Sequence, residues 1–205
     1  MGRVLYYETS TLEGIAENIL IQYDPFFFHK APQPAPIEHI IEEIFNLDIV
    51  YMCLTEAGDE LGRMIYDNGY TTRFNAEKDG YEWVRVTPGM MLIEVRLLED
   101  RALHGRHRFT LGHELGHFIL HKYLYAGTHL AAASYGIDEQ SVNSVEWQAN
   151  YIAKAILMPV VQVRRCFRQL IWEYGPDAVI IPDMAEIFDV SRQAMEIRLR
   201  EFGLV

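Results

Sequence analysis

The residues with the clearest chemical capacity in this sequence are His113, Glu114 and His117, which form the pattern H-E-x-x-H. Residues four apart on a helix share a face and lie about 6 Å apart along the axis, so both imidazoles can reach one metal ion. Glu114 is expected to take a proton from a water that the metal activates, and not to bind the metal. The pattern predicts a catalytic zinc site. The alternative is a buried helix whose histidines are only hydrogen-bonded.

A catalytic zinc ion usually has a third protein ligand, for which Glu146 is the best candidate. Glu146 begins a predicted helix that ends before Pro159. Asn150 lies one turn later on the same face, where a hydrogen bond from it can support a ligand. Glu139 is the rival, but a Gly- and Ser-rich segment fixes its position less well. A solvated Glu146 is also possible, because a carboxylate is favourable at a helix N-terminus without a metal.

His121 continues the histidine face of the first helix but is a poor candidate for a ligand. It would lie about 12 Å from His113 along the axis, too far for both to bind one ion. We expect it at the helix end, where an imidazole can meet free carbonyl groups.

The segment 122–140 joins the two predicted helices and is expected near the mouth of the site. Four of its side chains could donate a hydrogen bond to an oxyanion: Tyr123, Tyr125, His129 and Tyr135. The sequence does not rank them, and we assign none of them to the site.

The two helical segments together resemble a known family. The motifs are R-F-T-L-G-H-E-L-G-H at residues 108–117 and E-x-x-A-N-x-x-A-x-x-x-L-M-P at residues 146–159. They are similar to those of the ImmA/IrrE family of bacterial and phage metallo-endopeptidases, over roughly residues 15–160. The resemblance implies zinc ligands at His113, His117 and Glu146, with Glu114 as catalytic acid and base. Gly112 and Ile152 depart from the family pattern, but neither is a ligand.

Length and composition favour one compact domain, since half of the 205 residues are hydrophobic. We expect a peptidase domain over residues 1–160 and a helical extension over residues 161–205, packed on the same domain. Cys53 and Cys166 are too few for a disulfide framework and favour a reducing compartment. The sequence has no apolar stretch typical of a signal peptide or a membrane span, so we expect a cytoplasmic protein.

The net charge of −11 is confined to the first half of the chain. Residues 1–100 hold 7 Lys or Arg and 18 Asp or Glu, while residues 101–205 hold 11 of each. This distribution argues against broad binding to nucleic acid, which requires basic side chains. It could attract a basic protein substrate, or it could serve solubility alone.

The remaining elements predict an α+β, zincin-like fold with a small mixed or antiparallel sheet against the active-site helix. Helices are expected at residues 12–23, 37–45 and 160–172, and a proline-rich connector at 25–36. A buried strand is expected at 48–54. Two hairpins are expected, one joining 62–66 to 71–75 and one joining 82–86 to 90–97. Small residues four apart would let the two site helices approach closely: Gly112, Gly116, Ala149 and Ala153. The strand at 90–97, or one beside it, is expected to offer an edge for a peptide substrate.

Residues 184–204 predict two short helices joined near Ser191, which resemble a helix-turn-helix. The second helix carries arginines, but Glu196 and Glu201 interrupt its positive charge. We therefore favour a structural cap over a DNA reader.

Two classes of function stay open. The first is a zinc endopeptidase, and the resemblance implies that its substrate is a regulatory protein, often a transcriptional repressor. The second is a non-proteolytic zinc-containing module that binds a repressor or DNA through its C-terminal helices. The presence of Glu114 favours the enzyme, because a scaffold alone would not need a general base.

Overall fold

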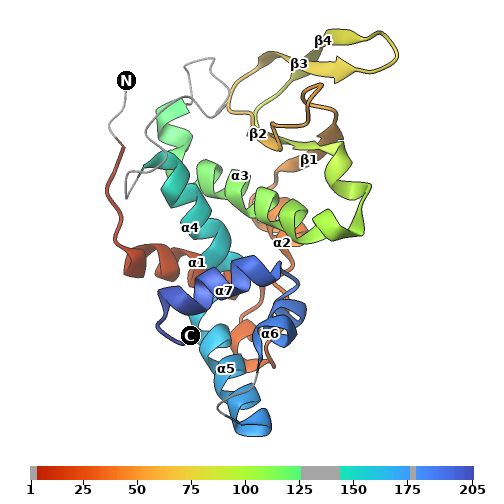
Figure 1. The fold of residues 1–205 in the computed structure, drawn as a ribbon. Helices are drawn as coiled ribbons and strands as arrows, with labels where there is room; N and C mark the ends of the chain where they lie inside the picture. Colours follow the sequence, from red (N-terminus) through yellow and green to blue (C-terminus); the bar gives the residue numbers. More distant parts are fainter. Residues whose placement is uncertain (1–3, 126–143, 176–178) are drawn as a thin grey trace.

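Two helices packed along each other form the centre of the fold, α3 (His104–Tyr125) and α4 (Val145–Leu157) (Figure 1). A computed structural model describes residues 4–125, 144–175 and 179–205. The helices are antiparallel, since Gly112 lies against Ala153 and Gly116 against Ala149. A methyl group added at Gly116 would lie 2.9 Å from the Ala149 backbone. The small residues therefore permit the close approach that the sequence predicted.

Helix α1 (Thr9–Tyr23) covers α4 from the N-terminal side and buries Leu12, Ala16, Ile19 and Leu20. The connector contains a short 3₁₀ turn at Phe27–His29, whose first residue is buried. Helix α2 (Ile37–His39) continues into a π-helical turn at Ile40–Ile44. Both helices were expected. However, α1 begins three residues before the predicted start, and most of the second predicted helix, residues 40–44, is π-helical instead of α-helical.

The main sheet has three strands in the order β1-β5-β2. Strand β5 (Met90–Glu94) is central, with β1 (Asp48–Met52) parallel to it and β2 (Gly62–Met64) antiparallel. Strands β3 (Gly69–Asn75) and β4 (Gly80–Val86) form a separate antiparallel pair that projects beyond the sheet and away from α3 (Figure 1). The short 3₁₀ segments Val95–Leu98 and Arg101–Leu103 lead from β5 into α3.

Both predicted hairpins were wrong. Strand β2 pairs with β5 and not with β3, and β3 pairs with β4 through a turn in which Asp79 adopts a left-handed backbone, with φ of 49°. The Asn-Gly signal at residues 68–69 starts β3 instead of closing a hairpin. The hairpin in this region therefore forms between β3 and β4. Its turn lies at residues 76–79, between the paired residues Asn75 and Gly80.

Two further expectations about strands need correction. Strand β1 is an edge strand whose one buried residue is Met52, whereas we predicted a buried strand. Residues 90–97 do not offer a free edge, because β5 is paired on both sides. The edge strands of this sheet are β1 and β2, and β2 is the one beside α3.

Three C-terminal helices pack below α1 and α4 (Figure 1): α5 (Val160–Tyr174), α6 (Ile181–Phe188) and α7 (Arg192–Glu201). Their apolar residues join the same core cluster as those of α1, α3 and α4. The division at residue 160 stays a prediction. None of the described helices is long and apolar enough to cross a bilayer.

Arg198 fixes α7 to the rest of the protein. Its side chain is fully buried, and its guanidinium donates two hydrogen bonds to the Glu13 carboxylate, at 2.7 and 2.9 Å. Its Nε also donates to the Met158 carbonyl oxygen at 3.1 Å. An arginine held in this way is not available to a phosphate, which agrees with a structural cap.

We predict that Gly116→Ala destabilises the fold by about 1–3 kcal/mol, because the new methyl group must push α4 away. Gly14→Ala is the matched control, since Gly14 lies inside α1 with no atom within 4 Å of an added Cβ. That change should stabilise by up to about 1 kcal/mol through helix propensity. Urea unfolding of both variants measures the difference, and equal effects would contradict the predicted close contact.

Candidate metal centre

Three donor groups from α3 and α4 converge at one point. His113 Nε2 lies 2.9 Å from His117 Nε2 and 3.3 Å from Glu146 Oε2. His117 Nε2 lies 3.4 Å from Glu146 Oε1. Atoms that bind a tetrahedral ion at about 2.1 Å are about 3.4 Å from one another, so these separations suit one ion. Among the described residues this is the one cluster of His, Cys, Asp or Glu groups with that capacity.

The hydrogen bonds behind the two imidazoles leave the correct atoms for a metal. His113 Nδ1 contacts Asn150 Oδ1 at 2.9 Å, and His117 Nδ1 contacts His121 Nδ1 at 3.3 Å. With both Nδ1 atoms engaged, the two Nε2 atoms face the Glu146 carboxylate, and each can bind a metal ion once the ion has displaced any proton there. Such a donor set fits zinc. Asn150 lies behind His113 as predicted, and the roles of these residues stay predictions.

The local sequence explains why Glu146 reaches the cluster. Ser144 caps α4 by accepting a hydrogen bond from the Trp147 N–H at 3.1 Å, so the helix begins immediately before Glu146. The Glu146 side chain is then in the first turn, next to the close contact between Ala149 and Gly116. The carboxylate is 19% exposed and the His113 ring 16%, so the cluster is open to solvent on one side.

The cluster favours an ionised carboxylate. Burial opposes the charge of Glu146, but hydrogen bonds from His113 and His117 outweigh it and hold the pKa of Glu146 far below its usual range. Burial also opposes the charge of His113, yet the carboxylates of Glu146 and Glu114 hold the pKa of His113 above its ordinary value. A metal ion must displace the His113 proton, so metal affinity falls as pH falls.

Glu114 has the surroundings of a general base. It is 4% exposed, and its Oε2 atom has no hydrogen-bond partner among the described residues. Burial raises the pKa of Glu114, and the nearby His113 and His117 offset this only in part. Glu114 and His113 line a hollow of about 260 Å³ together with Phe109, Thr110, Asn150 and residues 59–62. A proton acceptor of raised basicity thus faces a cleft beside the three donors.

Gly62 is a site residue that the sequence analysis missed. A Cβ built on it would lie 2.7 Å from both Cγ and Oε1 of Glu114, so only glycine lets β2 lie against this carboxylate. A glycine within a strand pattern is a signal of such close approach, and it could have drawn attention to residue 62.

The segment that leads to the cleft wall at residues 59–62 is held by Glu94, a residue that was also missed. Glu94 is 1% exposed; its Oε2 accepts from the Leu54 N–H at 2.8 Å and its Oε1 from Arg96 Nε at 2.7 Å. Arg96 also donates to the carbonyl oxygens of Thr55 and Glu56. Burial opposes the charge of Glu94, but the hydrogen bonds that its carboxylate accepts from Arg96 and Leu54 outweigh burial and lower the pKa of Glu94.

His121 does not lie at the helix end as expected. It is fully buried, and α3 continues for one more turn to Tyr125. Its Nε2 contacts Gln148 Oε1 at 2.8 Å, and burial lowers the pKa of His121 to about 4. It is not a member of the donor cluster, in agreement with the predicted helical geometry.

The candidates for oxyanion stabilisation have varied positions. The Tyr123 hydroxyl accepts a hydrogen bond from the Leu5 N–H at 3.1 Å, and the Tyr125 ring stacks on Tyr66 at 5.4 Å between centroids. Tyr66 was missed; its hydroxyl is buried without a hydrogen-bond partner among the described residues, and burial together with Glu114 raises its pKa. His129, Tyr135 and the rival ligand Glu139 lie outside the described residues.

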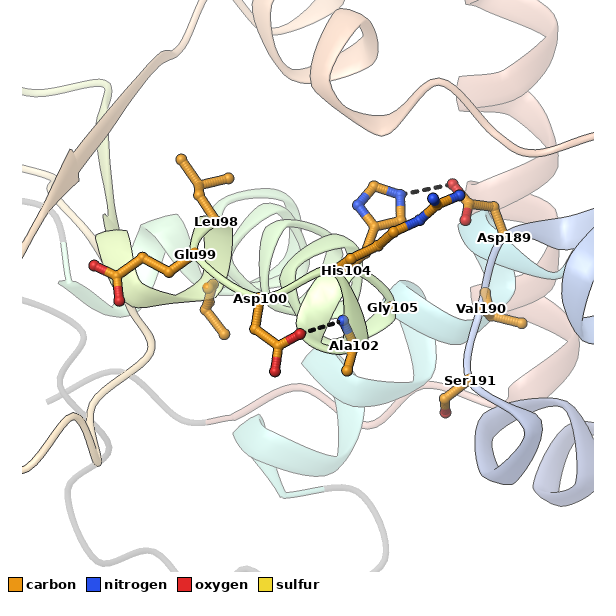
Figure 2. A pocket seen from close by; sticks show the side chains of 11 residues that line it. Leu98, Glu99, Asp100, Ala102, His104, Gly105, Asp189, Val190 and Ser191 are labelled. Carbon is orange, nitrogen blue, oxygen red and sulfur yellow. Dashed lines mark hydrogen bonds and ion pairs between the residues drawn. The ribbon is translucent and has the colours of Figure 1, made fainter.

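A larger hollow of about 830 Å³ lies elsewhere, between residues 97–105 and the turn at residues 189–191 that joins α6 to α7 (Figure 2). Two pairs of its polar groups contact each other: His104 Nε2 lies 2.8 Å from Asp189 Oδ2, and Asp100 accepts a hydrogen bond from the Ala102 N–H (Figure 2). It contains none of the three donors, so size alone does not identify the reactive site.

Comparison with known proteins agrees with the motifs. The family model Peptidase_M78, described as the IrrE N-terminal-like domain, matches residues 75–200. The match includes α3, α4 and the C-terminal helices, so it extends past residue 160 and omits residues 15–74, unlike the range that the motifs suggested. A search of curated proteins finds no match.

We predict that zinc stabilises the protein through Glu146. Zinc at one hundred times its dissociation constant should raise the free energy of unfolding by about 2.7 kcal/mol. Glu146→Ala removes one donor and should abolish most of this gain, whereas Glu43→Ala, at an exposed position outside the cluster, should retain it. Thermal unfolding with and without zinc measures both, and equal stabilisation of the two variants would exclude Glu146 as a ligand.

We predict a pH-dependent loss of stability in Glu94→Gln. The folded pKa of Glu94 is lowered, so its contribution is present above the unfolded pKa of about 4.3 and is lost as pH falls through the folded pKa. At pH 7 the change should cost about 1.5–3 kcal/mol. The gap to wild type should narrow as pH falls below about 4. Urea unfolding at several pH values measures this, with exposed Glu99→Gln as a control that shows no such gap.

Proposed function

Because the chain belongs to the Peptidase_M78 family of IrrE N-terminal-like domains, a metallopeptidase family, we propose that it is a zinc-dependent endopeptidase. One observation carries the proposal. The buried Glu114 carboxylate lies beside the three converging donors, has one oxygen without a partner among the described residues, and lines the cleft. A scaffold that only held a metal would gain nothing from this costly arrangement.

The proposed roles follow from these positions. His113, His117 and Glu146 would hold the zinc ion, which when bound polarises a peptide carbonyl and acidifies a water molecule. Glu114 accepts a proton from the attacking water and then donates it to the leaving amine, so its raised pKa favours the first transfer at neutral pH. The open side of the cluster, at His113 and Glu146, is where the scissile bond would lie.

The substrate backbone has a place to bind at β2. This strand is an edge of the main sheet, and residues 59–62 line the cleft together with Glu114. An extended peptide can add its main-chain hydrogen bonds to such an edge. The expectation of an edge for the substrate is therefore retained for β2, in place of residues 90–97.

We infer that the substrate is a regulatory protein, as the resemblance to the ImmA/IrrE motifs implies, with a transcriptional repressor as the specific expectation. The acidic first half of the chain supports a basic segment around the cleaved bond, because Asp59 borders the cleft, whereas the neighbouring Glu60 is already paired with Arg63. The alternative of docking to DNA through the C-terminal helices has less support. Arg198 is buried on Glu13, and Arg200 is paired with Glu196 at 2.5 Å.

Glu114→Gln tests the mechanism. The amide keeps the size of the carboxylate but cannot accept the proton, so we expect retained zinc binding and a loss of cleavage of about 10²–10⁴-fold. Glu43→Gln, at an exposed position that does not line the cleft, is the control and should keep its activity. The measurement is the appearance of a shorter fragment, by mass spectrometry, from the repressor encoded beside the gene. Undiminished cleavage by the Glu114 variant would overturn the proposed mechanism.

A further inference from the structure

The buried His121 lies one turn after His117 and has no role in the proposed mechanism of peptide hydrolysis. Its two ring nitrogens contact different partners: Nδ1 lies 3.3 Å from His117 Nδ1, and Nε2 lies 2.8 Å from Gln148 Oε1. We propose that His121 and Gln148 are positioning residues that fix the tautomer and ring orientation of His117, so that its Nε2 presents a lone pair to the metal. The inference rests on the proposed function only for the location of the metal.

The direction of these hydrogen bonds is fixed by the backbone of the N-terminal segment. The Leu5 carbonyl oxygen can only accept, and it lies 2.7 Å from Gln148 Nε2. The amide nitrogen of Gln148 must therefore point to Leu5, which turns the amide oxygen toward His121. This oxygen also can only accept, so the proton of His121 is on Nε2.

The same reasoning extends to the metal site. A neutral His121 ring with its proton on Nε2 has a lone pair on Nδ1. The ring is fully buried, and no carboxylate of the described residues is hydrogen-bonded to it. His117 Nδ1 must then be the donor in the contact between the two rings. With its Nδ1 proton committed to His121, His117 has Nε2, 3.4 Å from Glu146 Oε1, as the ring atom left to bind a metal ion.

His117 needs this support more than His113 does. The His117 side chain is 3% exposed, so water cannot readily satisfy its Nδ1, whereas the His113 side chain is 16% exposed and has Asn150 behind it. Without an acceptor at residue 121, His117 would lose the contact that selects between its two tautomers, and only one of them can bind through Nε2. An apolar side chain at residue 121 could fill the same space, but it has no acceptor atom and could not select the His117 tautomer.

Nitrogen-15 NMR of the histidine side chains in the metal-free, full-length protein tests the assignment directly. Long-range proton–nitrogen correlations distinguish the two neutral tautomers. We expect a proton on Nδ1 of His117 and the Nε2–H form for His121. Finding His121 in the Nδ1–H form, or His117 in the Nε2–H form, would overturn the proposal.

A matched pair of variants tests the consequence for zinc. His121→Leu removes the acceptor, and we expect zinc affinity to fall about 10–100-fold, with both His117 tautomers visible by NMR. His121→Asn keeps an oxygen near the position of Nδ1, so it should restore affinity to within a few-fold of wild type. Competition with a chromophoric chelator at fixed pH measures both. Unchanged affinity in the leucine variant would overturn the proposal, as would an asparagine variant no better than leucine.

Gln148→Met provides the test if the leucine variant does not fold, as judged by circular dichroism. It leaves His121 in place but removes its acceptor, so we expect mixed tautomers at His121 and His117 and a several-fold loss of zinc affinity. Wild-type tautomers in this variant would overturn the proposal. None of these measurements uses a peptide substrate, so a failure to find proteolysis would contradict the proposed function without deciding this inference.

Discussion

The distance between α3 and α4 is the constraint on which the site depends. The two imidazoles come from one helix and the carboxylate from the other, so no local interaction within either helix can set their separation. The backbone contacts of Gly112 with Ala153 and Gly116 with Ala149 set it instead. Metal–ligand distances tolerate errors of only about 0.2 Å, and a single extra methyl group between the helices exceeds that. Small residues are therefore as necessary to the centre as the ligands.

The buried polar groups next to the three donor residues include two kinds. Behind the metal ligands, buried groups such as His121 and Gln148 have partners for their ring and amide atoms, which offsets the cost of removing them from water. On the cleft side, Glu114 keeps an oxygen without such a partner among the described residues. An unsatisfied buried carboxylate costs stability, and this cost is the reason for proposing a catalytic role for Glu114.

The sequence predicted the helices and the proximity of His113, His117 and Glu146 much better than it predicted the sheet. The spacing of His113 and His117 is a local property of a helix. The glycines of α3 and the alanines of α4 predicted the close contact between these helices that brings Glu146 near the two histidines. Strand pairing is not local: the Asn-Gly signal was real, but nothing in residues 62–66 shows that their partner is β5, about thirty residues further along the chain. The two hairpins failed for this reason.

Other misses have a similar origin. His121 was placed at a helix end because the end of α3 is not marked by glycine or proline, and its actual partner, Gln148, belongs to another helix. Gly62 and Glu94 matter through contacts that connect strands and loops to the cleft. Periodicity shows which face of a helix is apolar, but it does not show which buried polar groups find one another across the core.

The salt bridge between Arg198 and Glu13 joins residues 185 positions apart. During synthesis, α1 with Glu13 leaves the ribosome long before Arg198 has been made. The Glu13 carboxylate therefore stays without its arginine partner until the end of the chain is released. The hydroxyl of Tyr151 donates a hydrogen bond to the same carboxylate at 2.8 Å, so this group of three side chains is also incomplete until Arg198 arrives. The nascent chain therefore completes its interior late, and contacts of such long sequence separation slow folding.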